Sequence, residues 1–223
     1  MPTVVFDLDG TLADTSADLV AAANACFRGL GHGDLLDPEA DALCAFHGGR
    51  AMLRLGFSRL GLGGDAEIDV EYPKLLAHYE TGIDRATRFY PGALDAVAAL
   101  RAKGYRTAIC TNKPERLAAM LMARLGATDL FDALVGADTL PVRKPDPAPY
   151  RAAVERAGGQ VHRSMLVGDT ETDRLTARAA EVPVALVAFG PEGHGVKRLE
   201  PDALLEHFDA LPALAARLLG VPA

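Results

Sequence analysis

TVVFDLDGTLADT, residues Thr3–Thr15, is the most informative stretch of this chain. Its first part, Thr3–Leu8, is rich in β-branched and apolar residues, which is typical of a buried strand. The strand leads directly into Asp7, Asp9 and Thr11, so it carries carboxylates and a hydroxyl at its carboxyl end. Runs of the same kind recur along the chain at Tyr105–Cys110, Ala133–Gly136, Met165–Gly168 and Val182–Val187.

Helical patterns lie between these runs, at Gly92–Lys103, Pro114–Leu125, Pro147–Ala157 and Thr172–Ala179. A strand followed by a helix, repeated about five times, predicts an α/β core with a doubly wound, Rossmann-like parallel sheet, because right-handed crossovers place helices on both faces. In such sheets ligands bind beyond the carboxyl ends of the strands.

One segment interrupts the alternation. Residues 15–88 contain helical patterns only, with Gly-rich joints at Gly29–Gly33 and Gly48–Gly49. We expect an inserted all-helical domain at 15–88, with the α/β core formed by residues 1–14 and 89–223.

The composition is that of a soluble globular protein, with 49% hydrophobic and 24% charged residues. The net charge is -7 and no run of basic residues exceeds two, which argues against nucleic acid as a partner. No apolar stretch approaches the roughly 18 residues that span a membrane. Three widely spaced cysteines without a CxxC pair favour a reducing compartment, so we expect a cytoplasmic protein.

Polar residues follow the predicted strands and converge on one edge of the sheet. They are Asp7, Asp9 and Thr11 after the first strand, Thr111 and Asn112 after Cys110, Lys144 in RKPDP, and Asp169 and Asp173 in GDTETD.

Four carboxylates at one edge require a counter-ion, because like charges at short range raise one another's pKa. Mg²⁺ fits, since it prefers carboxylates, water and phosphate oxygens as ligands. The six histidines form no HxxxH or HExxH pattern, which argues against zinc.

A carboxylate can attack phosphorus and form an aspartyl-phosphate. Asp7 is best placed as the nucleophile, and Asp9, two residues on, can act as acid and then base. Thr111, the backbone amide near Asn112 and Lys144 would hold the phosphoryl oxygens.

DLDGT, Thr111–Asn112, Lys144 before proline and GDxxxD resemble, in order, the four motifs of the haloacid dehalogenase superfamily. The resemblance spans essentially the whole chain. It implies a nucleophile at Asp7, an acid/base at Asp9 and phosphate contacts at Thr111 and Lys144. It also implies Mg²⁺ held by Asp7, the Asp9 carbonyl and Asp169, with Thr11 and Asp173 in support.

The insertion is similar to the cap of the phosphoglycolate phosphatase branch, through HGGRAM with His47 and Arg50. Arg50 could grip the carboxylate of a small acid, or it could be a helix-surface arginine. Two aspartates have two interpretations each: Asp173 could support the metal site or cap a helix, and Asp14 could bind a water of the metal or cap the first helix of the insertion.

The expected function is Mg²⁺-dependent hydrolysis of 2-phosphoglycolate to glycolate and phosphate. The partner is then a small phosphate ester, with no nucleic acid or membrane, and the protein a monomer or homodimer. The alternatives are a sugar phosphomutase, or a phosphatase for pyrophosphate, sugar phosphates or nucleotides, on the same core. A non-catalytic binding module is disfavoured because none of the motif residues is missing.

Overall fold

The computed structural model describes residues 1–62 and 64–221. The chain divides into a sheet unit, Met1–Ala13 with Phe89–Ala223, and a helical unit, Asp14–Arg88. The predicted insertion, 15–88, differs from the helical unit by one residue, Asp14. Gly63 and residues 222–223, which fall within the predicted domains, lie outside the described residues.

The sheet unit contains a six-stranded sheet in the order β5-β4-β1-β6-β7-β8, and each pairing is parallel. The strands are β1 (Thr3–Phe6), β4 (Arg106–Cys110), β5 (Ala133–Val135), β6 (Ser164–Gly168), β7 (Val184–Val187) and β8 (Ala203–Leu205). The α/β fold class is therefore confirmed, and the five predicted strands are present. The sixth, β8, was not predicted, because its three apolar residues sit in DALLEHFDAL, which also fits a helical period.

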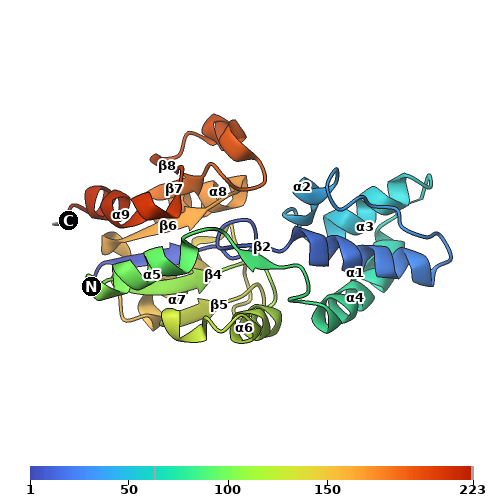
Figure 1. Ribbon diagram of the computed structural model, residues 1–223, viewed down its shortest axis with the longest axis horizontal. Coiled ribbons are helices and arrows are strands. Elements are labelled where there is room, and N and C mark those ends of the chain that lie inside the picture. Colours follow the sequence, from blue (N-terminus) through green and yellow to red (C-terminus); the bar gives the residue numbers. More distant parts are fainter. Residues whose placement is uncertain (63, 222–223) are drawn as a thin grey trace. The chain divides into compact units, whose positions relative to one another are not determined.

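Helices cover both faces of this sheet (Figure 1). They are α5 (Ala93–Ala102), α6 (Glu115–Arg124), α7 (Pro147–Arg156), α8 (Glu171–Ala180) and α9 (Leu211–Leu219), with short 3-10 turns at Thr128–Leu130, Val161–Arg163, Gly193–Leu199 and Phe208–Ala210. α5 packs against β4 and α9, whereas α7 packs against β4, β5 and α8. All four residues of β1 are buried, as expected for a central strand covered on both sides.

The four predicted helices of the sheet unit are present, each with bounds that differ by one residue at one or both ends. Pro114 was expected within the helix, but its ψ of 135° is extended and α6 begins at Glu115. The Glu115 N–H donates to Asp138 Oδ1 at 2.7 Å, so a side chain from another loop satisfies the helix start.

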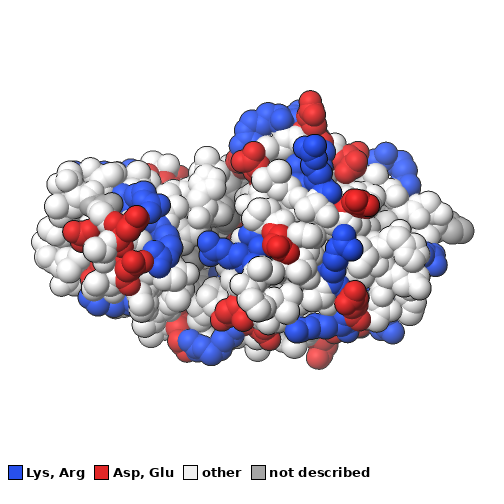
Figure 2. Space-filling view, turned by 180° about the vertical axis from the view of Figure 1, so that it is seen from behind, with Lys and Arg blue, Asp and Glu red and all other residues white. Residues whose placement is uncertain are grey.

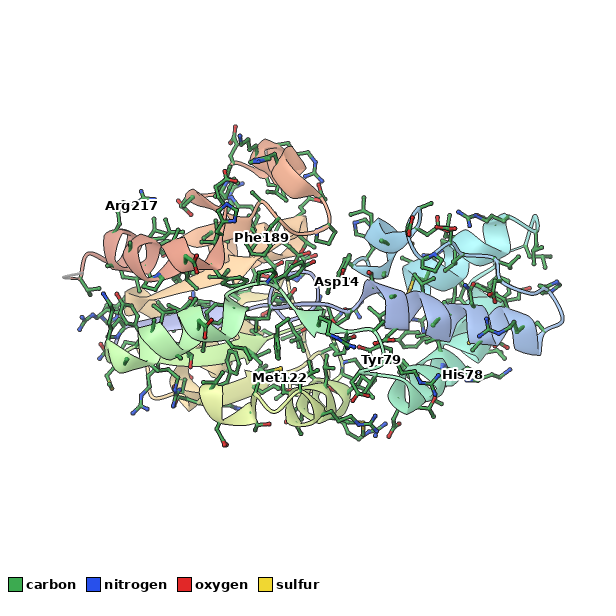
Figure 3. The ribbon with its side chains drawn as sticks, in the orientation of Figure 1. Asp14, His78, Tyr79, Met122, Phe189 and Arg217 are labelled. Carbon is green, nitrogen blue, oxygen red and sulfur yellow. The ribbon has the colours of Figure 1, made fainter. Side chains whose placement is uncertain are left out.

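The helical unit consists of α1 (Ser16–Gly29), α2 (Ala42–Ala45), α3 (Gly49–Ser58) and α4 (Asp65–Thr81). α1 packs on α3 and α4, and Phe27 contacts Phe57 edge-to-face with 5.3 Å between ring centroids. A Cβ at Gly56 would lie 2.2 Å from the Phe27 ring, so only glycine lets the ring rest on α3. Tyr79 of α4 is buried in the same unit (Figure 3).

The two ends of the helical unit are joined by Asp18. Its carboxylate accepts hydrogen bonds from the Ala86 N–H at 3.0 Å, the Thr87 N–H at 2.8 Å and Thr87 Oγ1 at 2.8 Å. At these ends β2 (Ala13–Asp14) and β3 (Arg88–Phe89) form a two-stranded sheet, of which only Arg88 falls within the predicted insertion.

The contacts of Asp14 favour the interpretation that its side chain caps the start of a helix. Its Oδ1 accepts hydrogen bonds from the N–H of Ser16 at 3.0 Å and from Ser16 Oγ at 2.6 Å, at the start of α1. The carboxylate therefore satisfies a donor of the first helical turn.

Charges of both signs are interspersed on the face shown in Figure 2. In the described part of the chain, no helix is long and apolar enough to cross a membrane.

Candidate active site

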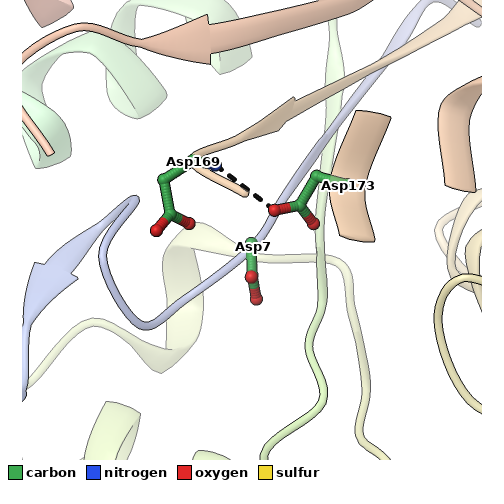
Figure 4. Close-up of side chains that lie close together, drawn as sticks. All are labelled: Asp7, Asp169 and Asp173. Atoms are coloured by element: carbon green, nitrogen blue, oxygen red, sulfur yellow. Dashed lines mark hydrogen bonds between the residues drawn. The ribbon is translucent and has the colours of Figure 1, made fainter. Parts of the chain in front are cut away.

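The site begins where β1 and β6 end side by side. Phe6 pairs with Val167, and the Asp7 N–H extends the ladder by donating to the Val167 carbonyl at 2.9 Å. This register places Asp7 beside Asp169, the first residue after β6. Carboxylate oxygens of Asp7, Asp169 and Asp173 lie within 4.8 Å of one another (Figure 4).

Asp173 reaches this group from the first turn of α8. It forms a capping box with Thr170, and its Oδ2 accepts from the Thr170 N–H at 3.1 Å, Thr170 Oγ1 at 2.8 Å and the Asp169 N–H at 3.3 Å. A Cβ at Gly168 would lie 2.4 Å from the Asp173 side chain, so glycine permits the approach. Asp173 is thus both part of the capping box of α8 and a member of the site, the two interpretations that its sequence position allowed.

Lys144 lies between these carboxylates. Its ammonium is 2.6 Å from Asp173 Oδ1 and 3.2 Å from Asp7 Oδ2, and its side chain is 1% exposed. Burial alone would lower the Lys144 pKa, but Asp173 and Asp7 outweigh it and the pKa is raised. Lys144 is therefore a fixed cation in this site.

The carboxyl groups facing Lys144 are hard to ionise in the absence of a metal. Burial raises the pKa of Asp7 to about 6, against the opposing effect of Lys144. Burial and the neighbouring Asp173 raise the pKa of Asp169 well above its usual range. A divalent cation would favour the ionised form of both groups.

Thr11 and Thr111 hold neighbouring loops in place. Thr11 Oγ1 donates to Asp169 Oδ1 at 2.8 Å, joining the loop after β1 to the end of β6. The Thr111 N–H donates to the Val135 carbonyl at 3.0 Å, and its Oγ1 accepts from the Lys113 N–H at 3.1 Å. Asn112 is exposed, and its amide donates to the Lys144 carbonyl at 3.0 Å, so it ties two loops of the site together.

Lys113 is a member of the site that the sequence analysis did not identify. Its ammonium lies 2.7 Å and 3.0 Å from the two carboxylate oxygens of Asp9. The available signal was a lysine directly after Thr111–Asn112, but a lysine before a helix is also an ordinary surface residue. Only the fold brings positions 9 and 113 together.

The loop after β7 forms a further wall. A Cβ at Gly190 would lie 2.8 Å from the Gly10 carbonyl oxygen and 3.5 Å from Asp169 Cβ. The preceding Phe189 packs on Tyr90 and Phe208, with ring centroids 5.2 Å and 5.1 Å apart (Figure 3). An aromatic cluster therefore holds Gly190 against the loop that carries Asp7 and Asp9.

The donor set fits a hard divalent cation. Asp7, Asp9, Asp169 and Asp173 against Lys113 and Lys144 leave a formal charge of -2 when all six are ionised. Asp173 already accepts four hydrogen bonds or ion pairs from protein groups, so Asp7 and Asp169 are the carboxylates best placed to bind a metal. Oxygen donors of this kind suit Mg²⁺.

Arg50 belongs to the helical unit, at the start of α3. It donates to Asp69 of α4 at 2.6 Å, and its guanidinium lies 4.9 Å from the centre of the Tyr72 ring. One turn further along, Arg54 pairs with Asp65 at 2.7 Å in the same way. The Arg50–Asp69 pair is about half exposed and the Arg54–Asp65 pair more so, and together they form an exposed ion-pair ladder between two helices.

Known proteins are similar to this chain in sequence and in fold. The haloacid dehalogenase-like hydrolase family matches residues 4–187. Proteins named phosphoglycolate phosphatase from Mesorhizobium japonicum and Agrobacterium fabrum are 41% and 39% identical, each over 98% of this chain and over 96% and 94% of their own lengths. A crystal structure described as a predicted phosphoglycolate phosphatase from Haemophilus somnus superposes with a TM-score of 0.83 at 22% identity, covering 96% of this chain and 97% of that one. The match over most of the sheet unit, including the strands that carry Asp7, Thr111 and Asp169, places this chain in the haloacid dehalogenase-like hydrolase family.

Proposed function

We propose that this protein is a Mg²⁺-dependent phosphatase that hydrolyses a small phosphate monoester, 2-phosphoglycolate first, through a phosphorylated Asp7. The observation that carries the proposal is the cluster of Asp7, Asp169, Asp173 and Lys144 at the carboxyl ends of β1 and β6. The two relatives named phosphoglycolate phosphatase, similar over nearly their full lengths, support the substrate.

The reaction has two displacements at phosphorus. In the first, an Asp7 carboxylate oxygen bonds to phosphorus while the bond from phosphorus to the ester oxygen breaks. Asp9 donates its proton to that leaving oxygen, which departs as the alcohol of glycolate. In the second, water adds to phosphorus, Asp9 takes the proton from this water, and the bond from phosphorus to Asp7 breaks. The products are glycolate and inorganic phosphate, and Asp7 and Asp9 regain their starting states.

Asp7 and Asp169, with the Asp9 carbonyl, would hold Mg²⁺, which supplies positive charge to the phosphoryl oxygens. Lys144 and Thr111 would bind the remaining phosphoryl oxygens, where a fixed cation and a hydroxyl stabilise the charge of the transition state. Thr11 orients Asp169, and Asp173 orients Lys144.

We also propose that Arg50 binds the carboxylate of the substrate. The partner it would exchange is Asp69, in a pair that is about half exposed. Exposed pairs contribute only about 0–1 kcal/mol, so exchanging one carboxylate for another costs little.

The test is phosphate release by the purified protein with MgCl2 from 2-phosphoglycolate, pyrophosphate, phosphoserine, sugar phosphates and nucleoside monophosphates. We expect 2-phosphoglycolate to give the highest kcat/KM and Asp7→Asn to abolish turnover. A folded protein that releases phosphate from none of these esters would contradict the phosphatase proposal. Release with a preference for another ester would overturn only the substrate, and conversion of a sugar phosphate to its isomer without net release would indicate a phosphomutase.

A further inference from the structure

The Lys113 ammonium contacts both oxygens of one carboxylate, that of Asp9, at 2.7 Å and 3.0 Å. The two side chains are 4% and 18% exposed. A charge-assisted contact in such a sheltered place is stronger than its surface counterpart, because water screens it less. Contact at both oxygens also restricts rotation of the carboxylate about its terminal bond.

The backbone of Lys113 is itself fixed on both sides. Its N–H donates to Thr111 Oγ1 at 3.1 Å, and its carbonyl accepts from the Ala137 N–H at 2.9 Å. Lys113 therefore stands on a loop anchored to the end of β4 and to the loop after β5. An ammonium on such an anchored loop defines one place for the carboxylate that it binds.

We propose that Lys113 is a positioning residue that holds the Asp9 carboxyl group at the place where it exchanges protons with the ester oxygen and with water. The inference rests on the acid–base role proposed above for Asp9. Proton transfer requires the donor and acceptor within hydrogen-bond reach, so a carboxyl group free to rotate would react less often. Lys113 itself neither gains nor loses a proton: the proton passes from Asp9 to the leaving oxygen and returns to Asp9 from the attacking water.

The experiment is a double-mutant cycle on the full-length protein with MgCl2 and 2-phosphoglycolate, using Lys113→Met, Asp9→Asn and the double variant. We expect Lys113→Met to lower kcat on the order of 10²-fold, as loss of general acid–base catalysis does. KM should change by about twofold or less, and Lys113→Arg should restore most of kcat. In the Asp9→Asn background, Lys113→Met should lower kcat by no more than about twofold, because a residue that acts through the Asp9 carboxyl group then has nothing left to position.

A substrate with an acidic leaving group separates the two proton transfers. With p-nitrophenyl phosphate the leaving oxygen needs no proton, so phosphorylation of Asp7 should remain fast in Lys113→Met while activation of water stays slow. We expect a burst of nitrophenol on the order of one per enzyme molecule, followed by a slow steady state. A lysine that only stabilises the fold would give no burst. The matched control is Lys103→Met, an exposed lysine before β4, which removes the same charge.

The outcomes separate the two proposals. If wild type releases no phosphate, the proposed function fails. If wild type is active and Lys113→Met lowers kcat by the same factor in the wild-type and Asp9→Asn backgrounds, Lys113 acts independently of Asp9 and the inference is overturned. If circular dichroism shows that Lys113→Met does not fold, the same cycle with Lys113→Gln decides: a loss of kcat that disappears in the Asp9→Asn background supports the inference, and a loss that persists or is absent overturns it.

Discussion

Lys144 and Asp173 form an ion pair of 2.6 Å in which the two side chains are 1% and 0% exposed. The pair joins the loop after β5 to the first turn of α8, and the same ammonium reaches Asp7 at 3.2 Å. One buried lysine thus supports both the site and the packing of the elements around it.

Lys144→Met should destabilise the protein strongly. The substitution leaves Asp173 as a buried carboxylate without its ammonium, and such losses cost about 3–5 kcal/mol. Urea unfolding, followed by circular dichroism, measures the free energy of unfolding. Adding Asp173→Asn should recover part of the loss, and Lys103→Met should change little. A Lys144→Met protein as stable as wild type would show that the pair contributes nothing.

Mg²⁺ should stabilise the protein more at high pH than at low pH. The folded-state pKa of Asp7 is raised to about 6 and that of Asp169 is also raised, so the stability linked to these groups is present at low pH and is lost as pH rises through those values. Mg²⁺ requires the ionised forms and reverses this loss. Thermal melts at about pH 5 and about pH 8, with MgCl2 against KCl of equal ionic strength, should give the larger increase in Tm at the higher pH. An equal or smaller increase there would contradict the assignment of these carboxylates as metal ligands.

Gly190→Ala should weaken metal binding. Its Cβ would meet the Gly10 carbonyl oxygen at 2.8 Å and Val187 at 2.9 Å, and so displace the loop that carries Asp7. The increase in Tm is measured as a function of Mg²⁺ concentration. The variant should need a higher Mg²⁺ concentration than wild type to reach the same increase. Gly195→Ala is the control, because its Cβ meets nothing closer than 3.8 Å. Identical Mg²⁺ curves for the two variants would rule out a role for the Gly190 contact.

Asp18→Ala should loosen the ends of the helical unit. The buried carboxylate accepts hydrogen bonds from Ala86 and Thr87, and losing an acceptor of this kind costs about 1.5–3 kcal/mol. Hydrogen exchange should become faster at the Ala86 and Thr87 amides. Asp95→Ala, an exposed acid in the first turn of α5, is the comparison and should have a small effect. Unchanged exchange at Ala86 and Thr87 would count against the expected role.

Arg50→Ala should reduce activity selectively on carboxylated substrates. Arg54 lies on the same helix as Arg50 and also pairs with an aspartate of α4, so Arg54→Ala serves as the control. Each substitution should change stability by about 1 kcal/mol or less, since both pairs are exposed. The kcat/KM for 2-phosphoglycolate relative to a sugar phosphate should fall only for Arg50→Ala. Equal ratios in both variants would assign Arg50 to the ion-pair ladder alone.

Much of the fold could be predicted because its signals are local. The strand Thr3–Leu8 and the helix Pro147–Ala157 were predicted from the residues within them, and both are present to within two residues. The short strand β8 was missed because three apolar residues carry no distinguishing period. Its place in the sheet depends on pairing with β7, which is a contact between distant segments.

The sequence by itself determined the order of strands and helices and the polar residues that follow each strand, because hydrophobic period and turn chemistry act over a few residues. Tertiary structure decided the pairings: Lys113 with Asp9, Thr11 with Asp169 and Lys144 with Asp173, which are separated by 104, 158 and 29 positions. It also decided that Lys113 lies beside the acidic cluster, so two lysines offset four carboxylates and leave a formal charge of -2. The physical reason is that charge–charge and hydrogen-bond energies depend on distance in space, and only the register of the parallel sheet brings these side chains within a few ångströms.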